Sequence, residues 1–191
     1  MTPLMDFMIR LVVFALGHSI LALPTLQQWV ALNSPAIFRF YRLFYNLVAI
    51  VTFGWVMVAW PLSPMIYLMP GAWSLLFHFL QLISLIMLAR CAAQTGIGDL
   101  IGLRQMRGEP PDRHLVTTGC YGRVRHPLYS LSIVFFVLNP VMTLKWLLLM
   151  AFSALYFVVG AHVEENRLEK EHGAAYRRYR ESVPMFVPKI R

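Results

Sequence analysis

Charged residues are scarce in this chain of 191 residues. They make up 14% of it, with nine acidic side chains, whereas a soluble domain carries about 25%. Between Leu43 and Ala89 there is no Asp, Glu, Lys or Arg. The hydrophobic fraction is 58% and the mean hydropathy is +0.59. This composition excludes an ordinary soluble domain and indicates an integral membrane protein.

Cysteine is also scarce, and internal repeats, low-complexity tracts and linkers are absent from the sequence. Cys91 and Cys120 fall in segments that the charge distribution assigns to the cytoplasm. Because that compartment is reducing, and because two ligands do not make a zinc site, we expect both thiols to be free and no metal to be bound. A single membrane domain over residues 1–191 is the predicted organisation.

The charge-free run is long enough for two membrane crossings. One crossing needs about 20 apolar residues, and the prolines of "WPLSPMIYLMPGAW" divide the run. Applied to the whole chain, the same criteria predict an all-α membrane protein of about five spans, which cover residues 4–23, 40–60, 73–90, 127–143 and 146–162. The last two form a short hairpin, and Asn139-Pro140 is expected to kink its first arm.

Basic residues follow alternate predicted spans. Arg39 and Arg42 follow the first span, six basic residues lie between 90 and 125, and seven lie between 167 and 191. By the positive-inside rule the amino terminus faces out and the carboxyl terminus lies in the cytoplasm. Topology and attraction to anionic lipids therefore account for the net charge of +8, and no nucleic-acid partner is expected.

The segment "TTGCYGRVRHPLYS" places Arg125 and His126 directly before Pro127. A proline suits the first turn of a helix and pushes the preceding residue out of helical conformation, which predicts His126 as the N-cap of the fourth span. The unpaired N–H groups there favour a carboxylate or phosphate ligand. The alternative is a plain capped helix whose arginine contacts lipid phosphates.

Two adjacent carboxylates, Glu164 and Glu165, follow the fifth span, across the short hairpin from Arg125 and His126. This meeting of opposite charges indicates either an ion-pair network that closes the hairpin or a site for a zwitterionic ligand. Farther along, apolar residues at helical spacing predict a cytoplasmic carboxyl-terminal helix that folds back as a lid, with Gly173 as its hinge.

Four motifs in order, "TTGCYGRVRHPLYS", the "EE" pair, the "GxxYxxY" spacing and "VPMFVP", resemble the isoprenylcysteine carboxyl methyltransferase and phospholipid methyltransferase superfamily. The resemblance extends from Gln94 to the carboxyl terminus. Together with "GDLIGLRQ" and "LGHSILALP", the motifs look most like bacterial membrane thiol methyltransferases of the methanethiol-methylating type. The resemblance implies the bacterial inner membrane as the location.

It also implies S-adenosylmethionine as the methyl donor, held in a cytoplasmic site formed by residues 94–130 and 162–188. The donor's methionine moiety is a zwitterion and suits the charged cluster. The candidate cofactor-binding residues are Tyr121, Arg125, His126, Pro127, Tyr129, Glu164 and Glu165. The candidates for the pocket roof are Asp99, Arg104 and Gln105. Arg104, His162 or Arg167 would favour the thiolate of a thiol acceptor, and the sequence does not choose among them.

The expected reaction is direct methyl transfer to a small or lipophilic acceptor, with a thiol or a carboxylate favoured. The membrane setting indicates a lipophilic or volatile molecule that enters from the bilayer. Three alternatives remain open at this point. They are an isoprenylcysteine-type carboxyl or phospholipid N-methyltransferase, a non-catalytic membrane accessory protein on the same scaffold, and a nicotinamide-dependent reductase with the same site architecture.

Overall fold

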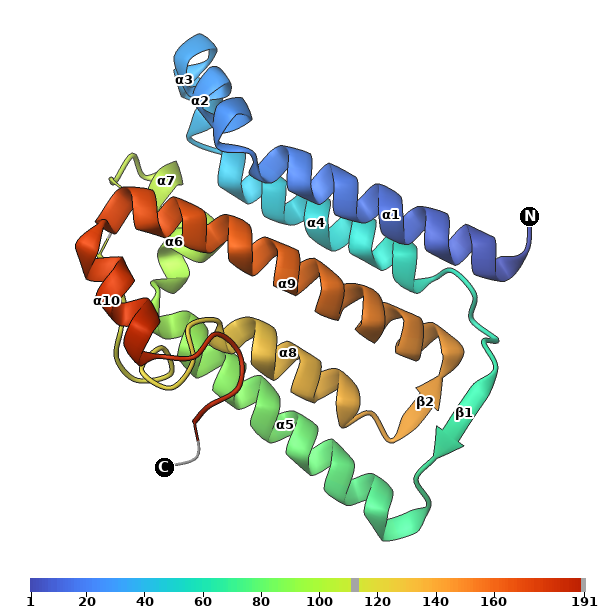
Figure 1. The fold of residues 1–191 in the computed structure, drawn as a ribbon. Helices are drawn as coiled ribbons and strands as arrows, with labels where there is room; N and C mark the ends of the chain where they lie inside the picture. The colour runs from blue at the N-terminus through green and yellow to red at the C-terminus, as the bar shows by residue number, and fades with distance from the viewer. Residues whose placement is uncertain (111–113, 190–191) are drawn as a thin grey trace. The chain divides into compact units, whose positions relative to one another are not determined.

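The protein is largely helical, and its described residues form two compact units (Figure 1). The structure, a computed structural model, describes residues 1–110 and 114–189. The first unit comprises residues 1–63 and 96–110, and the second comprises residues 64–95 and 114–189. Arg113 and Arg191, two of the basic residues behind the topology prediction, lie outside the described residues.

The first unit is built on two long antiparallel helices. Its helices are α1 (Pro3–Ala22), α2 (Pro24–Asn33), α3 (Pro35–Phe38), α4 (Tyr41–Met57), α6 (Ile97–Ile101) and α7 (Leu103–Met106). α1 packs along α4, and Phe7, Leu11 and Val56 are buried. The Arg10 guanidinium pairs with the Asp6 carboxylate at 2.9 Å, one turn away on α1.

The second unit is a three-helix layer closed at one end by a β-ribbon. Its elements are β1 (Met65–Leu68), α5 (Gly71–Gln94), α8 (Pro127–Val137), β2 (Val141–Thr143), α9 (Leu144–His172) and α10 (Ala174–Ser182). α8 contacts both α5 and α9 and lies between them (Figure 1). β1 and β2 pair antiparallel, with Met65 opposite Thr143 and Leu68 opposite Val141.

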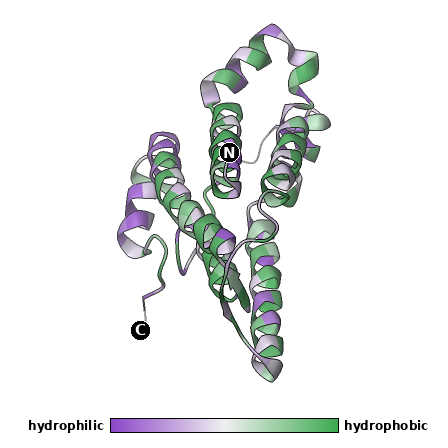
Figure 2. Cartoon of the chain, turned by 90° about the vertical axis from the view of Figure 1, so that its right-hand side faces the viewer, coloured by the Kyte–Doolittle hydropathy of each residue, from purple (hydrophilic) through white to green (hydrophobic). Residues whose placement is uncertain are grey.

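Large hydrophobic side chains cover the outer faces of the helices. Ile50, Leu75 and Leu155 are 71%, 72% and 67% exposed, and Figure 2 shows hydrophobic residues along most of the long helices. Such surfaces are unfavourable in water and favourable in lipid. α1, α5 and α9 are each long and apolar enough to cross a bilayer, whereas α4 and α8 are shorter. The fold class is therefore that of an all-α integral membrane protein.

The predicted helix over residues 127–143 is shorter in the structure. α8 has 11 residues and ends at Val137, which makes it about 17 Å long, against about 30 Å for a hydrocarbon core. Asn139 and Pro140 end the helix rather than kink it, because residues 141–143 leave it to pair with β1. That pairing joins segments more than 70 residues apart in the sequence, and no local sequence pattern predicts it.

The prediction of free thiols is wrong, because Cys91 and Cys120 form a disulfide with their Cα atoms 5.6 Å apart. The cross-link joins α5 to the loop that precedes α8. The side chain of Gln94 holds the same loop, since its Oε1 accepts the N–H of Cys120 at 3.0 Å. This packing brings the two sulfur atoms together, and a sequence separation of 29 gives no sign of it.

Removing the disulfide with Cys120→Ser is expected to lower the free energy of unfolding by about 2 to 4 kcal/mol, because the cross-link limits the unfolded chain. The measurement is the melting temperature of the detergent-purified protein with and without a reductant. The reductant should lower the melting temperature of the wild type and leave that of Cys120→Ser unchanged. A wild-type protein that melts alike under both conditions would contradict the prediction.

Candidate functional site

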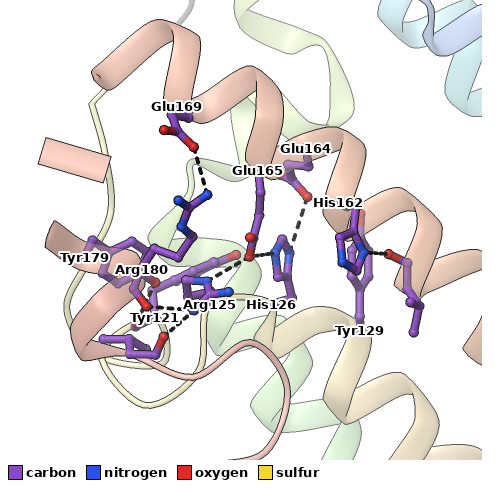
Figure 3. Close-up of polar contacts among 12 residues, drawn as sticks. Tyr121, Arg125, His126, Tyr129, His162, Glu164, Glu165, Glu169, Tyr179 and Arg180 are labelled. Atoms are coloured by element: carbon purple, nitrogen blue, oxygen red, sulfur yellow. Dashed lines mark hydrogen bonds and ion pairs between the residues drawn. The ribbon is translucent and has the colours of Figure 1, made fainter. Parts of the chain in front are cut away.

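The site is built at the amino-terminal end of α8. His126 is the N-cap, as predicted, with φ −121° and ψ 64°, outside the helical region as the following proline requires. Its ring points toward α9 and does not cap the helix (Figure 3). The backbone N–H groups of Arg125 and His126 donate to the carbonyls of Pro184 and Met185, at 2.9 and 3.1 Å. The carboxyl-terminal segment, residues 183–188, therefore runs beside the start of α8, and we call it the tail.

The other half of the site comes from the polar end of α9. The mostly apolar part of this helix, residues 144–163, is about 30 Å long and accounts for a full bilayer crossing. Glu164 and Glu165 come directly after it and lie beyond the span. Because successive residues on a helix point about 100° apart, the two side chains face different surroundings. The Glu165 side chain is 8% exposed, and that of Glu164 is 37% exposed.

An ion-pair network joins the two halves (Figure 3). Nε of Arg125 donates to Oε1 of Glu165 at 2.8 Å, and Nε2 of His126 lies 3.1 Å from the same oxygen. Nδ1 of His126 lies 3.5 Å from Oε2 of Glu164. The cluster expected from the sequence is thus present. Arg125, His126 and Glu165 form its closed, buried part, and Glu164 forms its accessible edge.

Both carboxyl groups are held in the charged form. Burial by itself raises the pKa of Glu165, but hydrogen bonds and charges from Arg125 and His126 outweigh it and keep that pKa below its ordinary value. Burial likewise raises the pKa of Glu164, and His126 and Arg167 outweigh it. Each side chain is therefore an anion at neutral pH. The charge of Glu165 is offset within the protein, and that of Glu164 is available to a ligand.

Arg125 also fixes the tail. Its Nη1 donates to the carbonyl of Val183 and, at 3.1 Å, to that of Arg180 at the end of α10. Oγ of Ser130 donates to the Phe186 carbonyl at 2.8 Å. The predicted carboxyl-terminal helix is confirmed as α10, which packs against α9 after a turn at Gly173 with φ +54°. It ends at Ser182, before Val183 and Phe186, which the helical pattern had included. Its movement as a lid remains a prediction.

Tyr129 connects the charged cluster to an apolar cavity. Its hydroxyl donates to Oε2 of Glu164 at 3.3 Å. Its ring stacks between those of His126, at 5.4 Å, and Phe157, at 4.8 Å, nearly parallel to both. Beyond this stack lies a cavity of about 580 Å³ between α5, α8, α9 and the tail, and Pro127 and Tyr129 belong to its wall. The arrangement can hold a charged group at one end and an apolar group at the other.

The remaining predicted residues make their hydrogen bonds outside the ion-pair network of Arg125, His126 and Glu165. Nδ1 of His162 bonds the Val158 carbonyl of its own helix at 2.7 Å, and the Tyr121 carbonyl accepts from the Tyr179 hydroxyl at 2.6 Å. Arg167 is exposed on α9.

Asp99, Arg104 and Gln105 belong to the first unit, where Arg104 pairs with Asp99 at 3.4 Å and the Gln105 side chain accepts the N–H of Arg42 at 3.3 Å. Their place in a pocket roof, and the role of Arg104, His162 or Arg167 in thiolate formation, remain predictions.

Sequence reasoning missed Phe157, whose ring contacts that of Tyr129, and assigned Phe186, whose ring contacts that of His126, to the apolar side of the carboxyl-terminal helix. An aromatic residue in an apolar stretch is normally read as packing, so its type carried no signal. It also missed the clamp from Arg125 to the tail. The signal available there was "VPMFVP", whose two prolines indicate an extended segment with carbonyl groups to be paired.

The fold and the site define a class: an all-α integral membrane protein with a charged cluster at its helix ends beside an apolar cavity. Methanethiol S-methyltransferase 2 of Bradyrhizobium diazoefficiens is 33% identical to this chain in an alignment of 190 positions, which covers 93% of this chain and 70% of that protein. The chain belongs to the methanethiol S-methyltransferase family, and it is a methyltransferase, as the sequence motifs predicted.

Two further relatives agree with this assignment. The methanethiol S-methyltransferase of Crocosphaera subtropica is 29% identical over 93% of this chain and 72% of its own length. That of a Pseudomonas species is 28% identical over 95% of this chain and 72% of its own length. No family model matches the chain. No solved structure matches it either.

Proposed function

We propose that the protein transfers a methyl group from S-adenosylmethionine to a small thiol. Methanethiol, the acceptor in the names of its relatives, is the simplest of these. The observation that carries the proposal is the separation of a partly exposed carboxylate, Glu164, from an apolar cavity by the ring of Tyr129. A methyl transfer of this kind needs a polar binding site for a cationic donor next to a water-free binding site for the acceptor.

The residues of the site fit the donor. S-adenosylmethionine carries an ammonium group, a carboxylate and a sulfonium-bound methyl group that is already activated for transfer. Glu164 is the accessible anion and suits the ammonium group, while the N–H groups in the first turn of α8 favour the carboxylate. Arg125 and His126, which the sequence proposed as ligands for that carboxylate, are already bonded to Glu165. We therefore assign them to positioning.

The protein's part in the reaction is orientation and exclusion of water. Glu164 fixes one end of the donor, and Tyr129, itself bonded to Glu164, separates donor and acceptor places. The apolar cavity wall keeps water from the attacking sulfur. Arg167 is our candidate for favouring the thiolate, because its charge already acts on Glu164 one turn before it. We further propose the bacterial inner membrane as the location, with the site on the cytoplasmic side, where the Cys91–Cys120 disulfide in the cavity wall would meet a reducing compartment and be open to reduction.

The test is ligand stabilisation of the purified protein in detergent. A saturating donor, at about 100 times its dissociation constant, should stabilise the folded state by about 2.7 kcal/mol and raise the melting temperature, whereas adenosine should do so weakly. Incubation with methanethiol should then yield dimethyl sulfide, measured by gas chromatography. Absence of both the thermal shift and the product would favour the non-catalytic accessory protein instead.

A further inference from the structure

We infer that the acceptor place accepts thiols that carry an apolar chain of several carbons, and that methanethiol uses a small part of it. This inference rests on the proposed function and concerns the acceptor alone. It starts from the cavity beside Tyr129. This cavity has a larger volume and a more extensive apolar wall than a substrate of two heavy atoms requires.

The volume of the cavity is about 580 Å³. A water molecule occupies about 30 Å³ of liquid, so a thiol of two heavy atoms needs roughly 60 Å³. Sites for drug-sized ligands measure about 300 to 1,000 Å³. The volume of the cavity therefore lies in the range for a substrate with a long chain. Methanethiol would occupy a small part of that volume.

The cavity wall is mostly apolar, although the exposed Arg123, in the loop before α8, also contributes to it. Met87 of α5, Leu131 of α8, Ala154 of α9 and Val187 of the tail contribute to it. Ser130 is in the wall, but its hydroxyl already donates to the Phe186 carbonyl. Burying the charged ends of the donor against such a wall would be unfavourable, so the cavity is not the donor's place. Hydrocarbon suits it, at about a fourfold gain in affinity for each methylene group buried.

The cavity adjoins the charged cluster, and this position indicates which end of a bound hydrocarbon carries the reacting group. Tyr129 is part of the cavity wall, and its hydroxyl bonds Glu164 at the proposed donor place. A chain lying in the cavity therefore has its head at the reacting end. The tail, fixed by Ser130 and by the backbone of His126, closes the wall on one side. These contacts point to a thiol with its sulfur near Tyr129 and its chain between α5, α8 and α9.

Methylation of such a thiol is chemically the same as that of methanethiol. The thiolate sulfur forms a bond to the methyl carbon while the bond from that carbon to the donor's sulfonium sulfur breaks. The electron pair of the broken bond stays with the donor's sulfur, and the thiol proton goes to water. The chain adds binding and orientation, and nothing in the reaction depends on its length.

The experiment is a series of straight-chain thiols, from methanethiol to decanethiol, with the full chain in detergent and saturating S-adenosylmethionine. We expect kcat/KM to rise with chain length and to exceed the methanethiol value by about 100-fold or more at hexanethiol, before it levels off. Ala154→Phe, which fills the cavity, should lower kcat/KM for hexanethiol roughly tenfold and that for methanethiol much less. Val159→Phe, at an exposed position about 140° around the same helix from Ala154, is the control and should change neither.

A readout without turnover separates this inference from the proposed function. Hexyl methyl sulfide, the product expected from hexanethiol, should raise the melting temperature of the wild type and not that of Ala154→Phe. If methanethiol is methylated but kcat/KM is flat with chain length and the sulfide has no effect, the inference is overturned and the function stands. If the sulfide binds as expected and no thiol is methylated, the inferred binding of an apolar chain in the cavity is supported and the proposed function is overturned. Phospholipid that copurifies and is not displaced by hexanethiol would make the cavity a lipid site and overturn the inference.

Discussion

Glu165→Ala is expected to lower the free energy of unfolding by about 3 to 5 kcal/mol, the largest effect on stability that we predict for a single side chain. The Glu165 carboxylate is buried and accepts from Arg125 at 2.8 Å, with His126 3.1 Å from the same oxygen. Its removal would leave Arg125 buried without its carboxylate. The measurement is thermal unfolding of the detergent-purified protein, followed by circular dichroism.

The matched control is Glu169→Ala, four residues along the same helix. Glu169 pairs with Arg180 at 2.8 Å, but both side chains are partly exposed, so its loss should change stability by at most about 1 kcal/mol. Two variants that unfold at the same temperature would show that burial of the Arg125–Glu165 pair does not support the fold. A well-folded Glu165→Ala protein with weakened donor binding would assign Glu165 to the donor instead.

Glu164→Gln should weaken S-adenosylmethionine binding about 10- to 150-fold, the range for losing a hydrogen bond to a charged group. The reason is the position of Glu164, whose side chain is the accessible edge of the cluster. Because its contacts to His126 and Tyr129 are long, at 3.5 and 3.3 Å, stability should change little. Calorimetric titration of the detergent-purified variant gives the affinity directly.

Tyr129→Phe provides the comparison for this second prediction. It removes the hydroxyl that donates to Glu164 and retains the ring stacked between His126 and Phe157. We expect a smaller loss of donor affinity, of about tenfold or less, because the carboxylate remains. Donor binding by Glu164→Gln at the wild-type affinity would exclude this carboxylate as a donor contact.

The sequence predicted the helices of this protein better than it predicted their pairing. The α1 and α5 segments lie close to the expected spans at 4–23 and 73–90, because a long, mostly apolar run constrains the backbone locally. The end of α8 at Val137 depends on a ribbon with residues 65–68, and the disulfide depends on how the loop before α8 packs on α5. Both are contacts between distant segments, and two isolated cysteines or one proline cannot specify them.

The candidate site shows the same division. Arg125, His126 and the acidic pair were found from residue type and spacing, since opposite charges at the ends of a short hairpin must meet. What the sequence could not separate was Glu164 from Glu165. Their roles differ because helix rotation turns Glu165 toward the start of α8 and leaves Glu164 at the edge. The direct cofactor contacts of these residues remain predictions.

The tail has a consequence for how copies of this protein coexist in one membrane. An extended segment normally offers a second row of backbone groups, and such an edge is a template for strand pairing between molecules. Here the carbonyls of Pro184 and Met185 are paired with the start of α8, and prolines at 184 and 188 remove two of the N–H donors that an outer ladder would need. The chain thus closes its cavity with a bent, proline-containing segment, which is a poor template for strand pairing between molecules.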